Sequence, residues 1–102
     1  MTYHVLATLT IKYGHIEQLT KTMKEFLPYM ESQGWHLQGA YVPVIGNFNK
    51  ITHVWKIDNL ESLNKMLSGM GSDPHVLKTI STFTEFVESE ELQMVVKTPY
   101  SP

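Results

Sequence analysis

Apolar and polar residues alternate along four stretches of the chain, and a period of two is typical of β-strands that bury one face. The four predicted strands cover residues 3–12, 35–45, 49–58 and 92–97. The third strand is the most regular, and its mostly apolar face carries Ile51, His53, Trp55 and Ile57. An imidazole and an indole therefore lie two residues apart on a face that either fills a core or lines a pocket.

Between these strands, apolar residues recur at helical spacing. The predicted helices cover residues 15–32, a segment that opens at Asp58, and a short segment that opens at Asp73. Asp58 with Glu61 three residues later fits a capping box. Asp73 followed by Pro74 fits an N-cap with proline at the first helical position. In the second helix the apolar stripe extends to Met70.

The order of these elements is strand, helix, strand, strand, helix pair, strand. A turn at residues 46–49 makes the second and third strands a hairpin. This order predicts a ferredoxin-like, split βαβ α+β fold, with a four-stranded antiparallel sheet and helices on one face. We expect one domain over residues 1–102.

The other face of the predicted sheet is partly apolar, which favours a partner. It carries Thr8, Thr10, Thr52, Val54 and Val95. Two such sheets packed face to face would form a homodimer, a dimeric α+β barrel.

Composition excludes several kinds of function. The chain has a net charge of -2, and its cationic residues are all lysine. Nucleic-acid binding usually needs basic stripes and arginine forks, so we do not expect a nucleic-acid partner. The chain has no cysteine, which excludes disulfides, thiolate catalysis and sulfur-ligated metals. Neither an export signal nor a stretch of membrane-spanning length is evident, so we expect a cytoplasmic protein without a membrane partner.

His53 is the leading candidate for chemistry. Burial on the helix-facing side of the sheet would keep the imidazole neutral and able to act as a base. The alternative is a core histidine whose ring is satisfied by a carbonyl or a water. His75, in the first turn of the third helix, is the second candidate for acid–base catalysis, because the helix dipole disfavours its protonation. The alternative for His75 is an ordinary surface residue.

Aromatic side chains on the same face would form the walls of a pocket for an apolar, planar substrate. They are Tyr3, Trp35, Tyr41 and Trp55, and the alternative is that they only fill the core. His4 and His36 alternate to the opposite face from His53, so we expect no metal site. The acidic run of Glu85, Glu88, Glu90 and Glu91 is interpreted as a solvated connection.

Four segments carry a recognisable pattern: GWHLQGAY at residues 34–41, IGNFN at 45–49, HVWK at 53–56 and LESL at 60–63. They resemble the NIPSNAP family, and the resemblance covers nearly the whole chain. The resemblance implies a dimeric α+β barrel, a superfamily that includes cofactor-free monooxygenases, haem-degrading enzymes and polyketide cyclases. The first strand differs, since the family often carries Glu-Leu-Arg-x-Tyr where this chain has VLATL at residues 5–9.

A weaker resemblance is to olivetolic acid cyclase, of the same superfamily. Residues 52–54 (THV) and 73–76 (DPHV) resemble the two segments that supply pocket histidines in that enzyme. Together these features predict a protein that binds an apolar or aromatic small molecule without a cofactor. It would be a monooxygenase-like or cyclase-like enzyme with His53 as acid–base group, or alternatively a non-catalytic domain that binds a ligand or a protein.

Overall fold

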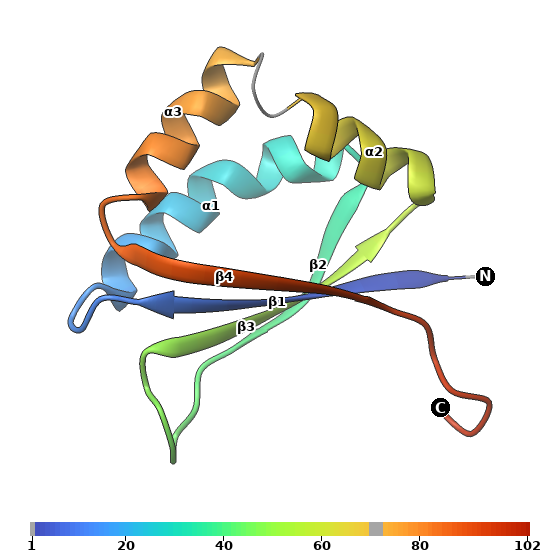
Figure 1. The fold of residues 1–102 in the computed structure, drawn as a ribbon, viewed down its shortest axis with the longest axis horizontal. Coiled ribbons are helices and arrows are strands. Elements are labelled where there is room, and N and C mark those ends of the chain that lie inside the picture. The colour runs from blue at the N-terminus through green and yellow to red at the C-terminus, as the bar shows by residue number, and fades with distance from the viewer. Residues whose placement is uncertain (1, 70–72) are drawn as a thin grey trace.

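The computed structural model describes residues 2–69 and 73–102. Its elements are, in order, β1 (Tyr3–Ile11), α1 (Ile16–Ser32), β2 (Trp35–Tyr41), β3 (Lys50–Ile57), α2 (Leu60–Gly69), α3 (Pro74–Phe83) and β4 (Val87–Val95). The three helices cover one face of the sheet, whereas the β2–β3 loop and the C-terminal tail extend from the other side (Figure 1). Met70, predicted as part of the apolar stripe of α2, lies outside the described residues.

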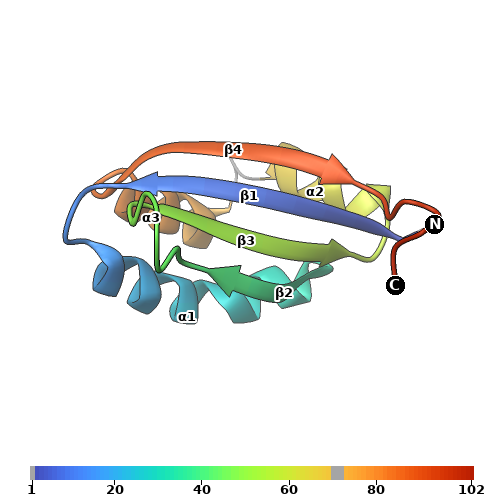
Figure 2. The same cartoon turned by 90° about the horizontal axis from the view of Figure 1, so that it is seen from below.

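The four strands form one antiparallel sheet in the order β2-β3-β1-β4 (Figure 2). The predicted ferredoxin-like α+β fold is therefore confirmed. The sheet is open, with β2 and β4 at its edges and β1 and β3 at its centre. The register pairs Ala7 of β1 with His53 of β3, so these two side chains share the face that the helices cover.

The core lies between that face and the helices. Alternate residues of β1 and β3 are buried there, and Leu19, Met23 and Met30 pack on them from α1. Phe86, at the junction of α3 and β4, is among the most deeply buried side chains. The strict alternation of buried residues in β3 is what the sequence predicts.

Gly34 sets the junction between α1 and β2. Its φ of +84° is one that residues with a Cβ rarely adopt. A Cβ at this position would also lie 2.6 Å from the Ser62 hydroxyl oxygen. Because only Gln33 and Gly34 connect α1 to β2, Trp35 enters the core directly after this short turn.

The start of α2 differs from the prediction. Asn59, not Asp58, caps this helix, since its side-chain oxygen accepts the Ser62 N–H at 3.0 Å. The Asp58 carboxylate instead lies 2.8 Å from the His36 Nε2. The predicted cap of α3 is confirmed, because the Asp73 carboxylate accepts the His75 N–H at 2.8 Å.

Both edge strands also differ from their predicted bounds. A β-bulge between Leu37 and Gly39 shifts the register of β2, and the strand ends at Tyr41 rather than at residue 45. β4 begins at Val87, well before the predicted residue 92, because it pairs with nearly the full length of β1. The acidic run interpreted as a solvated connection is thus mostly part of a strand. Within the described residues, no helix has the length and apolar character needed to cross a membrane.

Candidate small-molecule binding site

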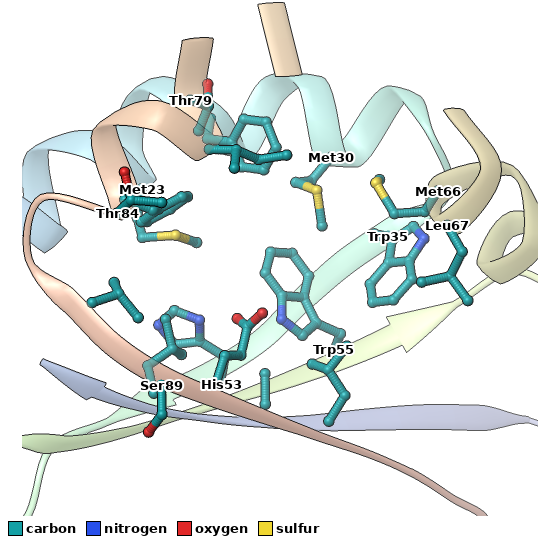
Figure 3. A pocket seen from close by; sticks show the side chains of 18 residues that line it. Met23, Met30, Trp35, His53, Trp55, Met66, Leu67, Thr79, Thr84 and Ser89 are labelled. Atoms are coloured by element: carbon teal, nitrogen blue, oxygen red, sulfur yellow. The ribbon is translucent and has the colours of Figure 1, made fainter. Parts of the chain in front are cut away.

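A cavity of about 380 Å³ lies between the sheet and the helices. Most of its lining is apolar, and the strands and all three helices contribute to it. Met23 and Met30 reach into it from α1 and Met66 from α2, opposite His53 and Trp55 on the sheet (Figure 3). Methionine side chains are flexible and polarisable, so this lining can adapt to ligands of different shape.

His53 stands on the floor of this cavity. Its partner in β1 is the small residue Ala7, and only 4% of His53 is exposed. Among the described residues, no hydrogen-bond partner or ion-pair partner reaches its ring. Burial lowers the pKa of His53 below its ordinary value of 6.5, which favours the neutral imidazole. A neutral imidazole that faces an apolar cavity is able to accept a proton or a hydrogen bond from a bound molecule.

Two tryptophans continue the floor and wall beside His53. The His53 and Trp55 rings meet edge to face with centroids 6.1 Å apart, and Trp55 meets Trp35 in the same way at 6.0 Å. The Trp35 indole N–H donates to the Ser62 carbonyl at 3.1 Å, which fixes that ring against α2. Both tryptophans line the cavity, as their strand faces predict.

The two tyrosines predicted as walls do not line the cavity. Tyr41 pairs with Thr52 on the opposite face of the sheet, and 62% of it is exposed. The bulge at Leu37/Gly39 explains this placement, because one extra residue moves every later side chain to the other face. Tyr3 packs against the edge of the core at the start of β1, away from the cavity.

His75 also lies outside the lining. Its ring is exposed and packs against two aromatic rings of α1, Phe26 at 6.3 Å and Tyr29 at 5.5 Å between centroids. Phe26 itself lines the cavity. His75 therefore packs against a side chain of the cavity wall and is not itself part of the lining.

Glu90 is the ionisable residue of the lining, besides His53, and sequence reasoning did not place it in the site. It lies on β4 opposite Leu9, on the helix-facing side of the sheet. Water still reaches the residue at this edge strand, yet the protein atoms around its carboxylate desolvate it and raise its pKa above the ordinary value of 4.5. The signal was available, since counting back in steps of two from Met94 and Leu92 places Glu90 on the same face.

The described residues contain no group of three or more histidine and carboxylate side chains that could hold a metal ion. His4 and His36 lie on the opposite face of the sheet from His53, as predicted, since they pair with Lys56. The His36 ring lies between two carboxylates, with Nδ1 2.9 Å from Glu31 and Nε2 2.8 Å from Asp58. Two hydrogen bonds raise the pKa of His36 above its ordinary value, and the bond to Glu31 has a larger effect than the bond to Asp58.

Fold and site together define a ferredoxin-like α+β protein with an aromatic, apolar cavity between sheet and helices. The family model for NIPSNAP matches residues 3–102, and the chain belongs to the NIPSNAP family. None of the curated proteins compared with the chain matches it.

Solved structures of other proteins, two of them NIPSNAP proteins by their descriptions, share this fold. A NIPSNAP family protein of unknown function from Agrobacterium tumefaciens superposes with a TM-score of 0.84 at 22% identity, over 99% of this chain and 92% of that one. An uncharacterized NIPSNAP domain protein from Burkholderia xenovorans gives 0.79 at 17% identity, over 98% of both chains. A conserved protein from Methanosarcina mazei gives 0.74 at 15% identity, over 96% and 94%. At these identities the likeness shows the fold alone.

Proposed function

We propose that this NIPSNAP protein binds an apolar, planar small molecule in the cavity and that His53 acts on it as a base. One observation carries the proposal. His53 is buried at the floor of a 380 Å³ cavity, and none of the described residues occupies its ring nitrogens. A core histidine is normally satisfied by the protein, so a buried and free ring beside a cavity favours a ligand as its partner.

The reaction that suits this site is proton abstraction from a carbon next to a carbonyl group. His53 would take the proton, and the electron pair of the C–H bond would move onto the carbonyl oxygen to give an enolate. The enolate carbon then forms a bond to a second carbonyl carbon of the same molecule, which closes a ring, and the resulting alkoxide takes the proton from His53. Alternatively, molecular oxygen as co-reactant oxidises the enolate and is reduced to a peroxide group on that carbon, which takes the same proton. Neither route requires a bound cofactor.

Trp35 and Trp55 would hold the planar part of the ligand, and the methionines would close over it. The catalytic role expected for His75 is not part of this proposal. Its ring would first have to leave Phe26 and Tyr29 to reach the cavity.

We further propose that two copies pack through the uncovered face of the sheet. The support is that this face carries half-buried apolar and hydroxyl side chains, among them Leu6, Thr8 and Val54. The β2–β3 loop, which contains the exposed residues Val44 and Ile45, extends on the same side of the sheet (Figure 1). Light scattering should give twice the chain mass, and Val54→Lys should give the monomer. A wild-type monomer at every concentration would contradict the dimer.

Binding can be tested with N-phenyl-1-naphthylamine, an uncharged aromatic probe. The only two tryptophans of the chain both line the cavity, so energy transfer from tryptophan to probe reports cavity occupancy. Thr79→Phe should fill the cavity and abolish transfer. Thr82→Phe is the matched control on the same helix, because Thr82 is also half-buried and also donates to a carbonyl four residues earlier, but does not line the cavity.

Catalysis is tested separately by proton exchange of acetophenone in D2O, followed by NMR. The wild type should accelerate exchange at the methyl group, and His53→Phe should lose the acceleration while retaining the naphthylamine probe. If the wild type binds the probe without accelerating exchange of any carbonyl compound tested, the protein is a non-catalytic ligand-binding domain instead.

A further inference from the structure

The charge of the cavity lining suggests which ligands it selects. Of the described residues that line it, only His53 and Glu90 are ionisable, and none is a lysine. The eight lysines of the chain all lie elsewhere, and it has no arginine. We propose that the cavity selects organic cations, namely aromatic or otherwise hydrophobic amines, and that Glu90 is their counterion. This inference rests on the proposed function, because it names the class of ligand for the same cavity.

Glu90 is placed to meet a ligand and not a residue of the protein. Its partner in the sheet is Leu9, and the next inward-facing residue of β4 is Leu92. No ion pair or hydrogen bond to its carboxylate forms among the described residues. The carboxylate is partly desolvated, although water still reaches it, and a bound ammonium group would supply the ionic partner that no described residue provides.

The rest of the lining also suits a cation. Four aromatic rings surround the cavity, and the face of an aromatic ring attracts an ammonium group. They belong to Phe26, Trp35, Trp55 and Phe83. His53 does not oppose this attraction, because its burial favours the uncharged imidazole. When Glu90 is ionised, the described lining therefore carries one negative charge and no compensating positive charge.

The same features disfavour acids. A carboxylate or phosphate group in this cavity would lie near Glu90 and would find no arginine or lysine among the described lining residues. Anion sites in proteins are usually built from such cationic side chains or from helix N-termini. The hydroxyls of Thr79 and Thr84 do not supply this charge.

Three probes with one ring system test the selection: 2-naphthylmethylamine, 2-naphthalenemethanol and 2-naphthoic acid. At pH 7 they are a cation, an uncharged alcohol and an anion of nearly equal size. We expect calorimetry to show the amine bound at least tenfold more tightly than the acid. Glu90→Gln should reduce the amine-to-acid preference about tenfold, since it removes the charge and keeps the shape.

The matched control is Glu85→Gln, which changes the net charge of the protein equally. Glu85 is exposed at the end of α3 and does not line the cavity. The Glu85→Gln variant should keep the wild-type preference for the amine over the acid. The affinity for the alcohol should change less than threefold in both variants.

The outcomes separate this inference from the function on which it rests. If the alcohol binds but the amine and the acid bind equally, or if Glu90→Gln leaves their ratio unchanged, the cation selectivity is wrong and the ligand cavity stands. If none of the three probes binds to the wild type but N-phenyl-1-naphthylamine does, the cation selectivity is wrong and the ligand cavity is retained, whereas if that probe does not bind either, both are overturned. An amine preference that Glu85→Gln abolishes as strongly as Glu90→Gln assigns the effect to net charge and also overturns the inference.

Discussion

Replacing His53 by phenylalanine should change how the stability of the protein depends on pH. The substitution keeps a planar ring in the cavity floor and removes the group that titrates. In the folded protein, burial lowers the pKa of His53 below 6.5. In the unfolded chain the same imidazole is hydrated and has its ordinary pKa of about 6.5.

The direction of the effect follows from proton binding. Between pH 6.5 and the lower pKa of the folded state, the unfolded chain binds more protons than the folded protein at this residue. The free energy of unfolding therefore falls as the pH is lowered through this window. One proton per molecule sets the upper limit of the slope, about 1.4 kcal/mol per pH unit. Above the window the contribution of His53 is complete and no longer varies.

The measurement is urea unfolding followed by tryptophan emission, at half-unit steps from pH 5 to 8, for the wild type and His53→Phe at one protein concentration. His36 and Glu90 titrate in both proteins, so their contributions cancel in the difference between the two curves. We expect that difference to be constant above about pH 7.5. It should fall on the acidic side of pH 6.5 with a slope of up to about 1.4 kcal/mol per unit.

Two results would refute this reasoning. If the difference does not vary with pH, His53 takes up its proton as easily in the folded protein as in water, and the cavity does not desolvate it. If the difference has the opposite slope, an acidic group stabilises the imidazolium. The first result removes the desolvation of His53 by the cavity, and the second also disfavours the neutral imidazole because it raises the pKa of His53 above its ordinary value.

Three further predictions concern the framework of the site. Gly14→Ala should lower the free energy of unfolding by about 1–2 kcal/mol because of its φ of +82° alone, since nothing lies within 4 Å of the added Cβ. Gly34→Ala should lower it further, because the added Cβ also meets the Ser62 hydroxyl. Urea unfolding measures both. Asn59→Ala should cost about 1 kcal/mol by losing the cap of α2, and an unchanged stability of Asn59→Ala would contradict this assignment. NMR titration should give His36 a pKa above 6.5, so its stabilising contribution is complete below pH 6.5 and is lost as the pH rises through the folded-state pKa.

Much of the fold and the centre of the site could be predicted from the sequence. Along β3 the alternation has no interruption, so the inward positions of His53 and Trp55 follow directly from it. The same holds for the cap of α3, because Asp73–Pro74 is a local signal that tertiary contacts do not change. Short-range sequence patterns were sufficient to place side chains wherever no β-bulge or long-range side-chain contact altered the element.

Prediction failed where a long-range contact decided the outcome. The bulge in β2 arises from pairing with β3, and it moved Tyr41 to the uncovered face although the alternation of the segment looks regular. At the start of α2, Asp58 and Asn59 are both good caps. The His36 ring, 22 residues away in sequence, takes the Asp58 carboxylate and leaves the cap to Asn59.

Glu90, the proposed counterion, was also misplaced by the sequence pattern because a long-range strand pairing decides its position. Glutamate is disfavoured in strands, and three neighbouring acids made residues 88–91 look like a solvated loop. Pairing with β1 overrides that preference, since β1 offers an unpaired edge along its length and the chain returns from α3 beside it. A carboxylate that serves only solubility would be expected at an outward position of such a strand. Glu90 instead lies at an inward position beside an apolar cavity, where the surrounding protein atoms partly desolvate its carboxylate although water still reaches it. Residues that break local rules in this way are often functional.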